Sequence, residues 1–109
     1  MNKKEIEKLK EIKEILENIP HVENCSSVNY NSSGSIPNQF IINGKDFILF
    51  QSYRSPIALK MNGKVYLFKD WDYSVTTGKY RNDFLGETKK ETLQKLKNEE
   101  YIAVDFEVI

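Results

Sequence analysis

Residues 39–50 read QFIINGKDFILF, and residues 57–68 repeat the same design as IALKMNGKVYLF. Each stretch places Asn-Gly between two short apolar runs. This arrangement is the strongest short-range signal for a β-hairpin, because both residues tolerate the positive φ angles of the tight turn. In the second stretch apolar residues also alternate, as on the two faces of a strand. The two stretches therefore predict two hairpins, and they decide the fold.

Upstream of the hairpins, residues 3–19 predict an amphipathic helix that ends before Pro20, which cannot continue a helix. Asn2 and Glu5 have the spacing of a capping arrangement at its start. Its apolar residues recur at steps of three and four: Ile6, Leu9, Ile12, Ile15, Leu16 and Ile19. Such a stripe suits packing either on the sheet or on a second copy of the chain, so a dimer through residues 3–19 stays open.

Residues 22–38 are polar, and Asn31-Ser32-Ser33-Gly34 lies at their centre. Two interpretations compete for this stretch. It is a linker, or it is a strand near Ser26–Tyr30 that turns at Ser33-Gly34 into the next strand. We favour the hairpin, because Val28 and Tyr30 alternate correctly and long structureless loops are uncommon in small domains.

Downstream, residues 74–97 predict two short helices. The first begins near Ser74–Thr77 and ends by Gly86, and the second begins at Thr88, whose capping box with Glu91 is well spaced. Leu93 and Leu96 are expected to face inward. Residues 101–108 alternate as a last strand.

The whole chain is expected to be one α+β domain over residues 1–109, with the sheet region at 22–68. It would have an N-terminal helix, an antiparallel sheet of five to six strands, two C-terminal helices and a final strand, with the helices on one face.

Composition excludes several classes of protein. Sixteen Lys and Arg balance sixteen Asp and Glu in 109 residues, so no global basic field attracts nucleic acid or an anionic membrane. The single cysteine, Cys25, forbids a disulfide within the chain and fits a reducing cytosol. We find no apolar run long enough to span a membrane and no signal-peptide pattern, so a cytoplasmic protein without a membrane partner is expected.

Catalytic and metal chemistry finds little support in the sequence. His21 is the only histidine, and with Cys25 it supplies two ligands where a zinc site needs at least three. The chain contains neither GxxxxGK[ST] nor GxGxxG, the two glycine-rich motifs that bind phosphate groups. Asp70, Asp72 and Asp83 could share a metal, but nearby cations make a solvated turn the better explanation. We therefore expect no enzyme, no cofactor and no metal.

The distinctive stretch is residues 71–87, WDYSVTTGKYRNDFLGE. Residues 39–81 hold seven cations and three acids, interleaved with aromatic rings. Aromatic rings that stack on bases and cations that contact phosphates are typical of a nucleic-acid-binding surface. The same residue types are equally typical of a protein–protein hot spot. Some of the rings could instead belong to the core. The candidate partner-binding residues are Tyr53, Arg54, Trp71, Tyr73, Ser74, Thr76, Thr77, Lys79, Tyr80 and Arg81.

The hydroxyls Ser74, Thr76 and Thr77 have a structural task at this helix start, where one should be the N-cap. A cap needs only one of them. The surplus, with Lys79 and Arg81 nearby, could hold an anion such as phosphate. Capping alone is the simpler interpretation, and a small phosphorylated ligand is the third functional hypothesis.

Four segments together resemble a family of short uncharacterised proteins encoded by bacteriophages and other mobile elements. They are FQSYRSPIA at 50–58, GKVYL at 63–67, WDYSVTTGKYRNDFLGE at 71–87 and KKETLQKLKNEEYI at 89–102. Many relatives have His where Tyr80 stands, which weakens any role that needs an imidazole. The resemblance implies a phage-type accessory protein in a bacterial cell.

In that context the leading hypothesis is a non-enzymatic protein that binds and inhibits a host protein or ribonucleoprotein, with a CRISPR–Cas effector as the named candidate. The alternative is a nucleic-acid-binding module that uses the basic aromatic half, residues 39–81. The near-neutral charge speaks against a global DNA mimic, which would be strongly acidic.

Overall fold

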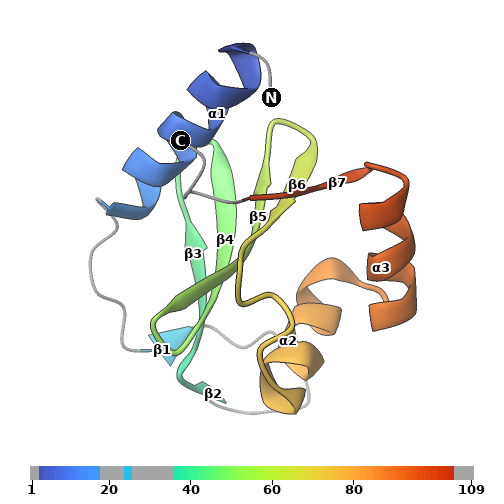
Figure 1. Cartoon of the computed structure of the whole chain (residues 1–109). Coiled ribbons are helices and arrows are strands. Elements are labelled where there is room, and N and C mark those ends of the chain that lie inside the picture. Colours follow the sequence, from blue (N-terminus) through green and yellow to red (C-terminus); the bar gives the residue numbers. More distant parts are fainter. Residues whose placement is uncertain (1–2, 18–23, 26–35, 105–109) are drawn as a thin grey trace.

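A computed structural model of the chain describes residues 3–17, 24–25 and 36–104 (Figure 1). The elements in chain order are α1 (Lys3–Glu17), β1 (Asn24–Cys25), β2 (Ile36–Pro37), β3 (Gln39–Asn43), β4 (Phe47–Ser52), β5 (Ser55–Met61), β6 (Lys64–Leu67), α2 (Val75–Leu85), α3 (Lys89–Lys97) and β7 (Tyr101–Ala103). The predicted α+β class and its order of elements are confirmed.

The main sheet has five strands in the order β3-β4-β5-β6-β7. The first four strands are antiparallel neighbours, as predicted. The last strand differs, because β7 pairs with β6 in parallel. A parallel neighbour needs a crossover, and here α2 and α3 supply it between the two strands. The expectation of a purely antiparallel sheet is therefore wrong, and the sheet is mixed.

Both predicted hairpins are present, but only the second turns at Asn-Gly. In the first, Asn43 is the last residue of β3 and pairs with Ile48, so the turn falls at Lys45-Asp46. Asn62 and Gly63 have φ angles of 55° and 74°, as a turn with two positive φ angles requires. At the other turn, the Gly44 amide donates to the Phe47 carbonyl at 2.9 Å. The Phe47 ring lies directly over Gly44, where a Cβ atom would fall 2.0 Å from the ring. Only glycine fits beneath this ring.

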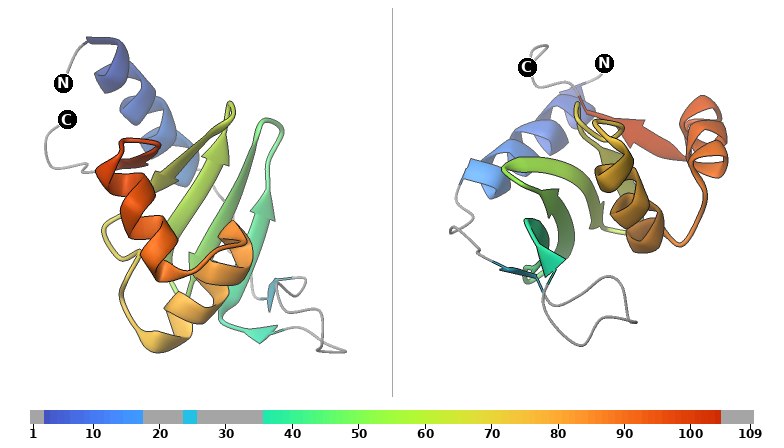
Figure 2. Two further views of the ribbon diagram at one scale, coloured as in Figure 1. Left: turned by 90° about the vertical axis from the view of Figure 1, so that its right-hand side faces the viewer. Right: turned by 90° about the horizontal axis from the view of Figure 1, so that it is seen from below.

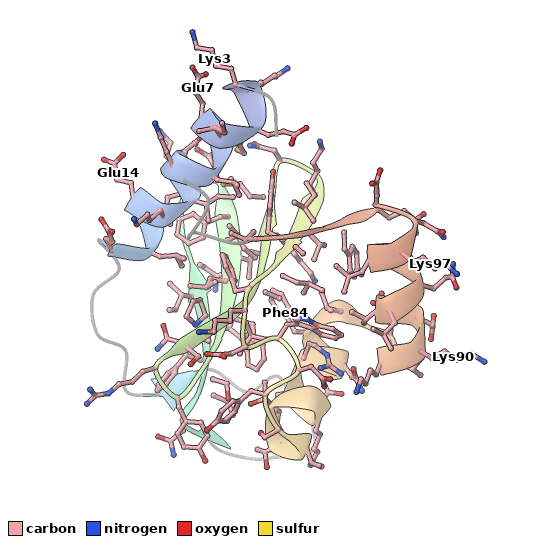
Figure 3. The ribbon with its side chains drawn as sticks, in the orientation of Figure 1. Lys3, Glu7, Glu14, Phe84, Lys90 and Lys97 are labelled. Atoms are coloured by element: carbon pink, nitrogen blue, oxygen red, sulfur yellow. The ribbon has the colours of Figure 1, made fainter. Side chains whose placement is uncertain are left out.

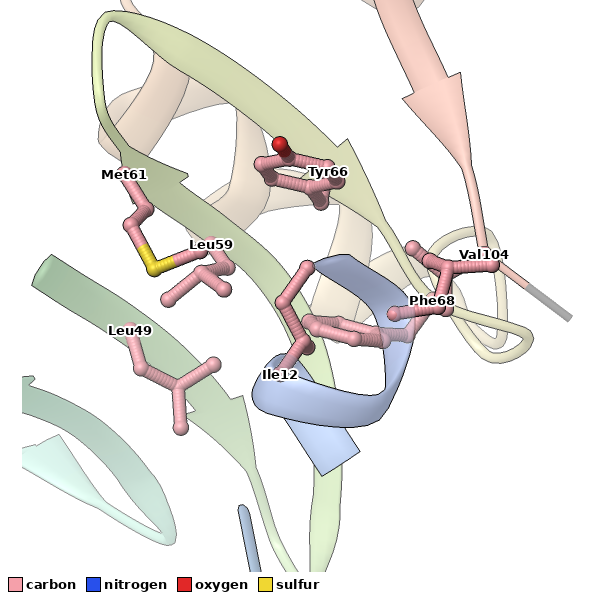
Figure 4. Packing of buried hydrophobic residues seen from close by; sticks show 8 residues of the cluster. Ile12, Leu49, Leu59, Met61, Tyr66, Phe68 and Val104 are labelled. Carbon is pink, nitrogen blue, oxygen red and sulfur yellow. The ribbon is translucent and has the colours of Figure 1, made fainter. Parts of the chain in front are cut away.

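Helices cover both faces of the sheet, which corrects the expectation that they share one face (Figures 1 and 2). One core cluster joins Leu9 and Ile12 of α1 to the sheet through Leu49, Leu59, Met61, Tyr66, Phe68 and Val104 (Figure 4). The second cluster has Phe50, Ile57, Ala58 and Leu67, packed against residues of α2 and α3. Strands buried on both faces carry adjacent apolar residues rather than a strict alternation, as Ile57-Ala58-Leu59 does.

A β-bulge in β5 adjusts this packing. Phe50 pairs with Ala58 and Gln51 pairs with Pro56, so Ile57 is the extra residue on its strand. Pro56 thereby sits beside the irregularity near the strand start, where a missing N–H group disturbs the ladder least.

The stripe of α1 is used inside the chain. Leu9 and Ile12 are buried, and Ile15 and Leu16 pack against the same cluster. The stripe that was considered for a dimer is therefore occupied by the protein's own sheet, while Lys3, Glu7 and Glu14 point away from it (Figure 3). Beside the buried stripe, Lys8 and Glu11 form an ion pair at 3.2 Å.

Helices α2 and α3 begin as the sequence predicts. Ser74 is the N-cap of α2, since its Oγ accepts the Thr77 amide at 3.1 Å. Thr88 and Glu91 form the full capping box of α3. One expectation for α3 is wrong: Leu93 is 47% exposed, and Thr92 takes the buried position instead. The polar Thr92 is tolerated there because its hydroxyl donates to Glu87.

Several expectations lie outside the described residues: the Asn2 cap, the end of the first helix at residues 18–19, His21, the strand at 26–30, the turn at Ser33-Gly34, and residues 105–108 of the last strand. Of the stretch 22–38, the structure describes Asn38 and the strands β1 and β2, which pair antiparallel with each other as a separate small sheet. In the described part of the chain, no helix is long and apolar enough to cross a membrane.

The C-terminal end of α3 offers a stability prediction. Glu99 has a φ angle of 62° just after the cap residue Asn98, and the Glu100 amide bonds the Lys95 carbonyl at 2.9 Å. This left-handed position favours glycine, so Glu99→Gly should raise the free energy of unfolding by about 1 kcal/mol in urea denaturation. Glu100→Gly is the matched control and should not stabilise. A Glu99→Gly variant less stable than the parent would contradict this.

Candidate functional site

Three hydroxyl groups connect the β4–β5 turn to the start of α2. Ser52 Oγ and Thr77 Oγ1 lie 3.0 Å apart in the interior. Ser74 Oγ donates to the same Thr77 oxygen at 3.2 Å. Because Tyr53 follows Ser52 and Tyr73 precedes Ser74, this contact holds two distant tyrosine-bearing segments side by side. The sequence alone gave no sign that they meet.

Tyr53 occupies an unfavourable backbone conformation. Its φ angle is 55°, a left-handed conformation that costs a bulky residue on the order of 1 kcal/mol. Within the described residues, the non-glycine positions of positive φ are Asn38, Tyr53, Asn62 and Glu99. Two of the four carry asparagine, which tolerates this conformation. The Tyr53 amide also donates to the Asn38 carbonyl at 2.6 Å, which helps to fix the turn.

The side chains around this junction are largely exposed. Tyr53 is 53% exposed, Tyr73 is 70% exposed and Val75 is 91% exposed. We call this region the Tyr53 surface, and it consists of Tyr53, Arg54, Tyr73, Ser74, Val75 and Thr76. Lys79 is exposed on the same helix. Sequence reasoning missed Val75, although an aliphatic residue at the first position of a helix, beside Tyr73, was a usable signal.

Two of the candidate contact residues are buried, which corrects their assignment. Thr77 is 0% exposed and is used by the hydroxyl contact. Arg81 is 1% exposed, and its Nη1 donates to the Trp71 carbonyl at 2.8 Å while its Nη2 donates to Asn82 Oδ1 at 2.9 Å. The spacing of α2 places both residues, four apart, on the face toward the sheet. Neither can touch a partner in this conformation.

Two more candidates divide their surface between core and solvent. Trp71 and Tyr80 are half-buried and pack against the second core cluster, beside Phe84, which lies between α2 and the sheet (Figure 3). The Arg81 guanidinium stacks 5.1 Å from the centre of the Trp71 ring. Trp71 therefore serves mainly to cover the core and to hold Arg81.

The start of α2 is less suited to an anion than its composition suggests. Ser74 and Thr77 bond to each other and to Ser52, and Arg81 points inward. Only Thr76 of the three hydroxyl residues keeps its side chain free of these contacts. The extra hydroxyls thus join elements of the fold, and the phosphorylated-ligand hypothesis gains no support.

A buried carboxylate was missed altogether. The Glu87 side chain is 2% exposed, and it accepts hydrogen bonds from Thr92 Oγ1 at 2.5 Å, Lys95 Nζ at 2.7 Å and Tyr101 OH at 2.6 Å. The group joins the α2–α3 connection, α3 and β7. In sequence Glu87 reads as an ordinary charged residue after a glycine, and only the fold encloses it.

The charges of this cluster argue for a structural role. Burial alone would raise the pKa of Glu87, but the hydrogen bonds from Lys95, Thr92 and Tyr101 outweigh burial and hold the pKa below its ordinary value. Burial, and then the hydrogen bond to Glu87, raises the pKa of Tyr101 to about 12. A general acid or base works best with a pKa near the operating pH, and both groups are moved away from it.

Of the three aspartates considered as metal ligands, Asp72 is held in ion pairs. Asp72 pairs with Lys89 at 2.8 Å and with Arg81 at 3.4 Å. The hydrogen bond from Lys89 is the main reason that the pKa of Asp72 lies below its ordinary value. Among residues 3–17, 24–25 and 36–104, no three His, Cys, Asp or Glu side chains are grouped to hold a metal ion.

Comparison with known proteins gives a family but no activity. Residues 12–101 match a family of unknown function, DUF8033, and the match runs from the middle of α1 to the start of β7. The chain therefore belongs to this family. The chain matches no curated protein, and it matches no solved structure.

Proposed function

We propose that this member of the DUF8033 family is a non-enzymatic binding protein whose contact with its partner is the Tyr53 surface. The observation that carries the proposal is Tyr53 itself, an exposed tyrosine kept in a backbone conformation where asparagine or glycine would be more stable. Stability does not explain this residue, whereas tyrosine is among the commonest hot-spot residues at protein interfaces.

The surroundings of Tyr53 suit a protein partner better than a nucleic acid. Tyr73 and Val75 extend the exposed apolar area, and Arg54 adds an arginine, a residue type that is enriched at hot spots of protein interfaces. A stacking surface for single strands needs several exposed rings in a basic groove. Here Tyr66 is buried, and Trp71 and Tyr80 lie partly in the core. Two expected cations are also turned inward, since Arg81 is buried and Lys60 bonds the Phe84 carbonyl at 2.7 Å.

The finer proposal concerns the partner. The resemblance to short phage and mobile-element proteins favours a bacterial host component in the cytoplasm, and we propose a CRISPR–Cas effector as the first candidate. A small protein without catalytic groups can inhibit such an effector by covering a surface that the effector needs for its activity. The direct test is target-DNA cleavage by a purified effector, with the protein added at increasing concentration; unchanged cleavage across effector types would exclude this candidate.

The binding surface is tested by a substitution whose effects on stability and on binding have opposite signs. Tyr53→Asn should raise the free energy of unfolding by about 1 kcal/mol, because asparagine tolerates the left-handed backbone. The same variant should weaken partner binding by about 2 kcal/mol or more, because a hot-spot ring is lost. Urea denaturation and affinity capture from a bacterial lysate, followed by mass spectrometry, measure the two effects.

Controls separate binding from folding and from nucleic acid. Lys90→Ala on the outer side of α3 should leave both stability and capture unchanged (Figure 3). Capture is repeated after nuclease treatment and at raised salt, because phosphate contacts weaken steeply with salt. A partner held equally by the parent and by Tyr53→Asn with Tyr73→Ser would refute the Tyr53 surface, and capture lost after nuclease would favour the nucleic-acid alternative.

A further inference from the structure

The opposite end of the sheet carries a second surface feature. An open groove lies between the β3–β4 and β5–β6 turns and is lined by Lys45, Asp46, Ile48, Lys60, Lys64 and Val65, among others. The Tyr53 surface flanks the β4–β5 turn, which is at the other end of the same strands. In the left view of Figure 2 the two hairpin tips project beyond α2. The groove is thus separate from the Tyr53 surface.

The sheet register explains how the groove gains its apolar part. Ile48 pairs with Lys60, and Lys60 pairs with Val65, so the three side chains form one row across the face that α2 and α3 cover. The two helices cover only part of this row, so Ile48 remains 39% exposed. An exposed aliphatic residue on this face, near the β3–β4 turn and beside the helix layer, offers a contact for an apolar side chain.

The charges of the groove are mostly positive. Three lysines line it against the single acid Asp46, although the whole chain has no net charge. Lys60 is already held by the Phe84 carbonyl and lies 4.4 Å from the centre of the Phe84 ring. Within the described residues, neither Lys45 nor Lys64 has an ion-pair partner. The two tip lysines are therefore available to an anionic ligand.

The groove is also preformed. Its two turns are tight, and the Phe47 ring locks the first of them over Gly44. Asn62-Gly63 fixes the second through two positive φ angles. Tight turns fix the backbone positions of Lys45 and Lys64, so the backbone of the groove need not be ordered at the moment of binding.

From this combination we propose that the groove binds a short acidic segment of a partner protein that carries an aliphatic side chain. The carboxylates would lie against Lys45 and Lys64, and the aliphatic side chain against Ile48. A nucleic acid is disfavoured as the occupant, because bases bind single-strand sites by stacking on aromatic rings. The groove offers Phe47 alone, and its ring packs over Gly44 and against the α1-side core.

The test uses the full chain and a fluorescein-labelled peptide of Asp and Glu residues with two Leu, followed by fluorescence anisotropy. The parent should bind this probe, and binding should weaken as salt rises. Lys45→Glu with Lys64→Glu should weaken binding at least about tenfold, since reversed charges repel the probe. Ile48→Ser should weaken it by about threefold or more, through the lost aliphatic contact.

Matched controls make each outcome decisive. Lys90→Glu with Lys97→Glu changes the net charge equally on the outer side of α3 and should leave binding within about twofold of the parent. Thermal melting confirms that all variants fold. The proposal is overturned if the reversed-charge variant binds the probe like the parent, or if a Leu-free peptide or single-stranded DNA binds as tightly. The proposal is also overturned if the parent does not bind the probe and instead sediments as a dimer that forms through the groove end of the sheet.

Discussion

Arg81→Ala should lower the free energy of unfolding by about 3 kcal/mol, which is a large part of the stability of a small domain. The Arg81 guanidinium is buried, donates to the Trp71 carbonyl and to Asn82, and stacks on the Trp71 ring. Removing it leaves a cavity and an unpaired carbonyl in the interior. We place the expected loss at the lower end for a broken buried pair, because Asp72 is 40% exposed and keeps Lys89 as a partner.

Conservative variants separate the contributions of volume and hydrogen bonding. Arg81→Met keeps much of the volume but none of the donors, and Arg81→Lys keeps the charge but loses the planar fork. Both should lie between the parent and Arg81→Ala. Lys79→Ala, on the exposed side of the same helix, is the control and should change stability by less than about 0.5 kcal/mol.

Urea denaturation of the four variants measures these differences. An Arg81→Ala midpoint as high as that of Lys79→Ala would show that the buried contacts contribute nothing. The result also matters for function, since a loss of partner binding in an Arg81 variant reports unfolding. Binding experiments should therefore combine Arg54→Ala with Lys79→Ala, both at exposed positions.

Glu87→Gln should lower the free energy of unfolding by about 2–3 kcal/mol at neutral pH. The buried carboxylate accepts from Thr92, Lys95 and Tyr101 at once, and only a carboxylate offers acceptors alone. A glutamine amide points its NH₂ group at one of these donors. The α3–β7 segment should therefore loosen first, which hydrogen exchange at β7 amides would detect.

The pH dependence of stability follows from the direction of each pKa shift. The folded-state pKa of Glu87 is depressed, so its contribution is present above the unfolded pKa of about 4 and is lost as pH falls through the folded value. The folded-state pKa of Tyr101 is raised from 10.0 to about 12, so its contribution is present below pH 10 and is lost as pH rises toward 12. Glu87→Gln should therefore make stability less dependent on pH in the acidic range, and it should also reduce the loss of stability in the alkaline range.

Tyr101→Phe supplies the matched control for this cluster. This variant keeps the ring but removes the hydroxyl. It should therefore abolish the part of the stability loss at alkaline pH that is due to Tyr101, and it should keep the stability loss at acidic pH that is due to Glu87. Absorbance titration of the tyrosines, taken as the difference between parent and variant, reports the raised pKa directly. An unchanged acid limb in Glu87→Gln would mean that the hydrogen bonds to this carboxylate do not stabilise the fold.

Local patterns determined much of this protein. Asn-Gly between apolar runs located both hairpins, although only Asn62-Gly63 forms the turn itself. The three-and-four spacing of Leu9 and Ile12 specified the buried side of α1. Ser74, Thr88 and Glu91 marked helix starts that the structure contains. These features depend on residues a few positions apart, so the sequence states them directly.

Long-range packing decided what the local patterns could not. The parallel pairing of β7 and the placement of helices on both faces depend on where α2 and α3 lie after the chain has turned back. The same holds for burial: Arg81 and Glu87 are charged residues that sequence assigns to the surface, but the fold encloses them because each finds its partners there. The two segments of the Tyr53 surface likewise meet only in the folded chain, where Ser52 contacts Thr77 across 25 positions of sequence.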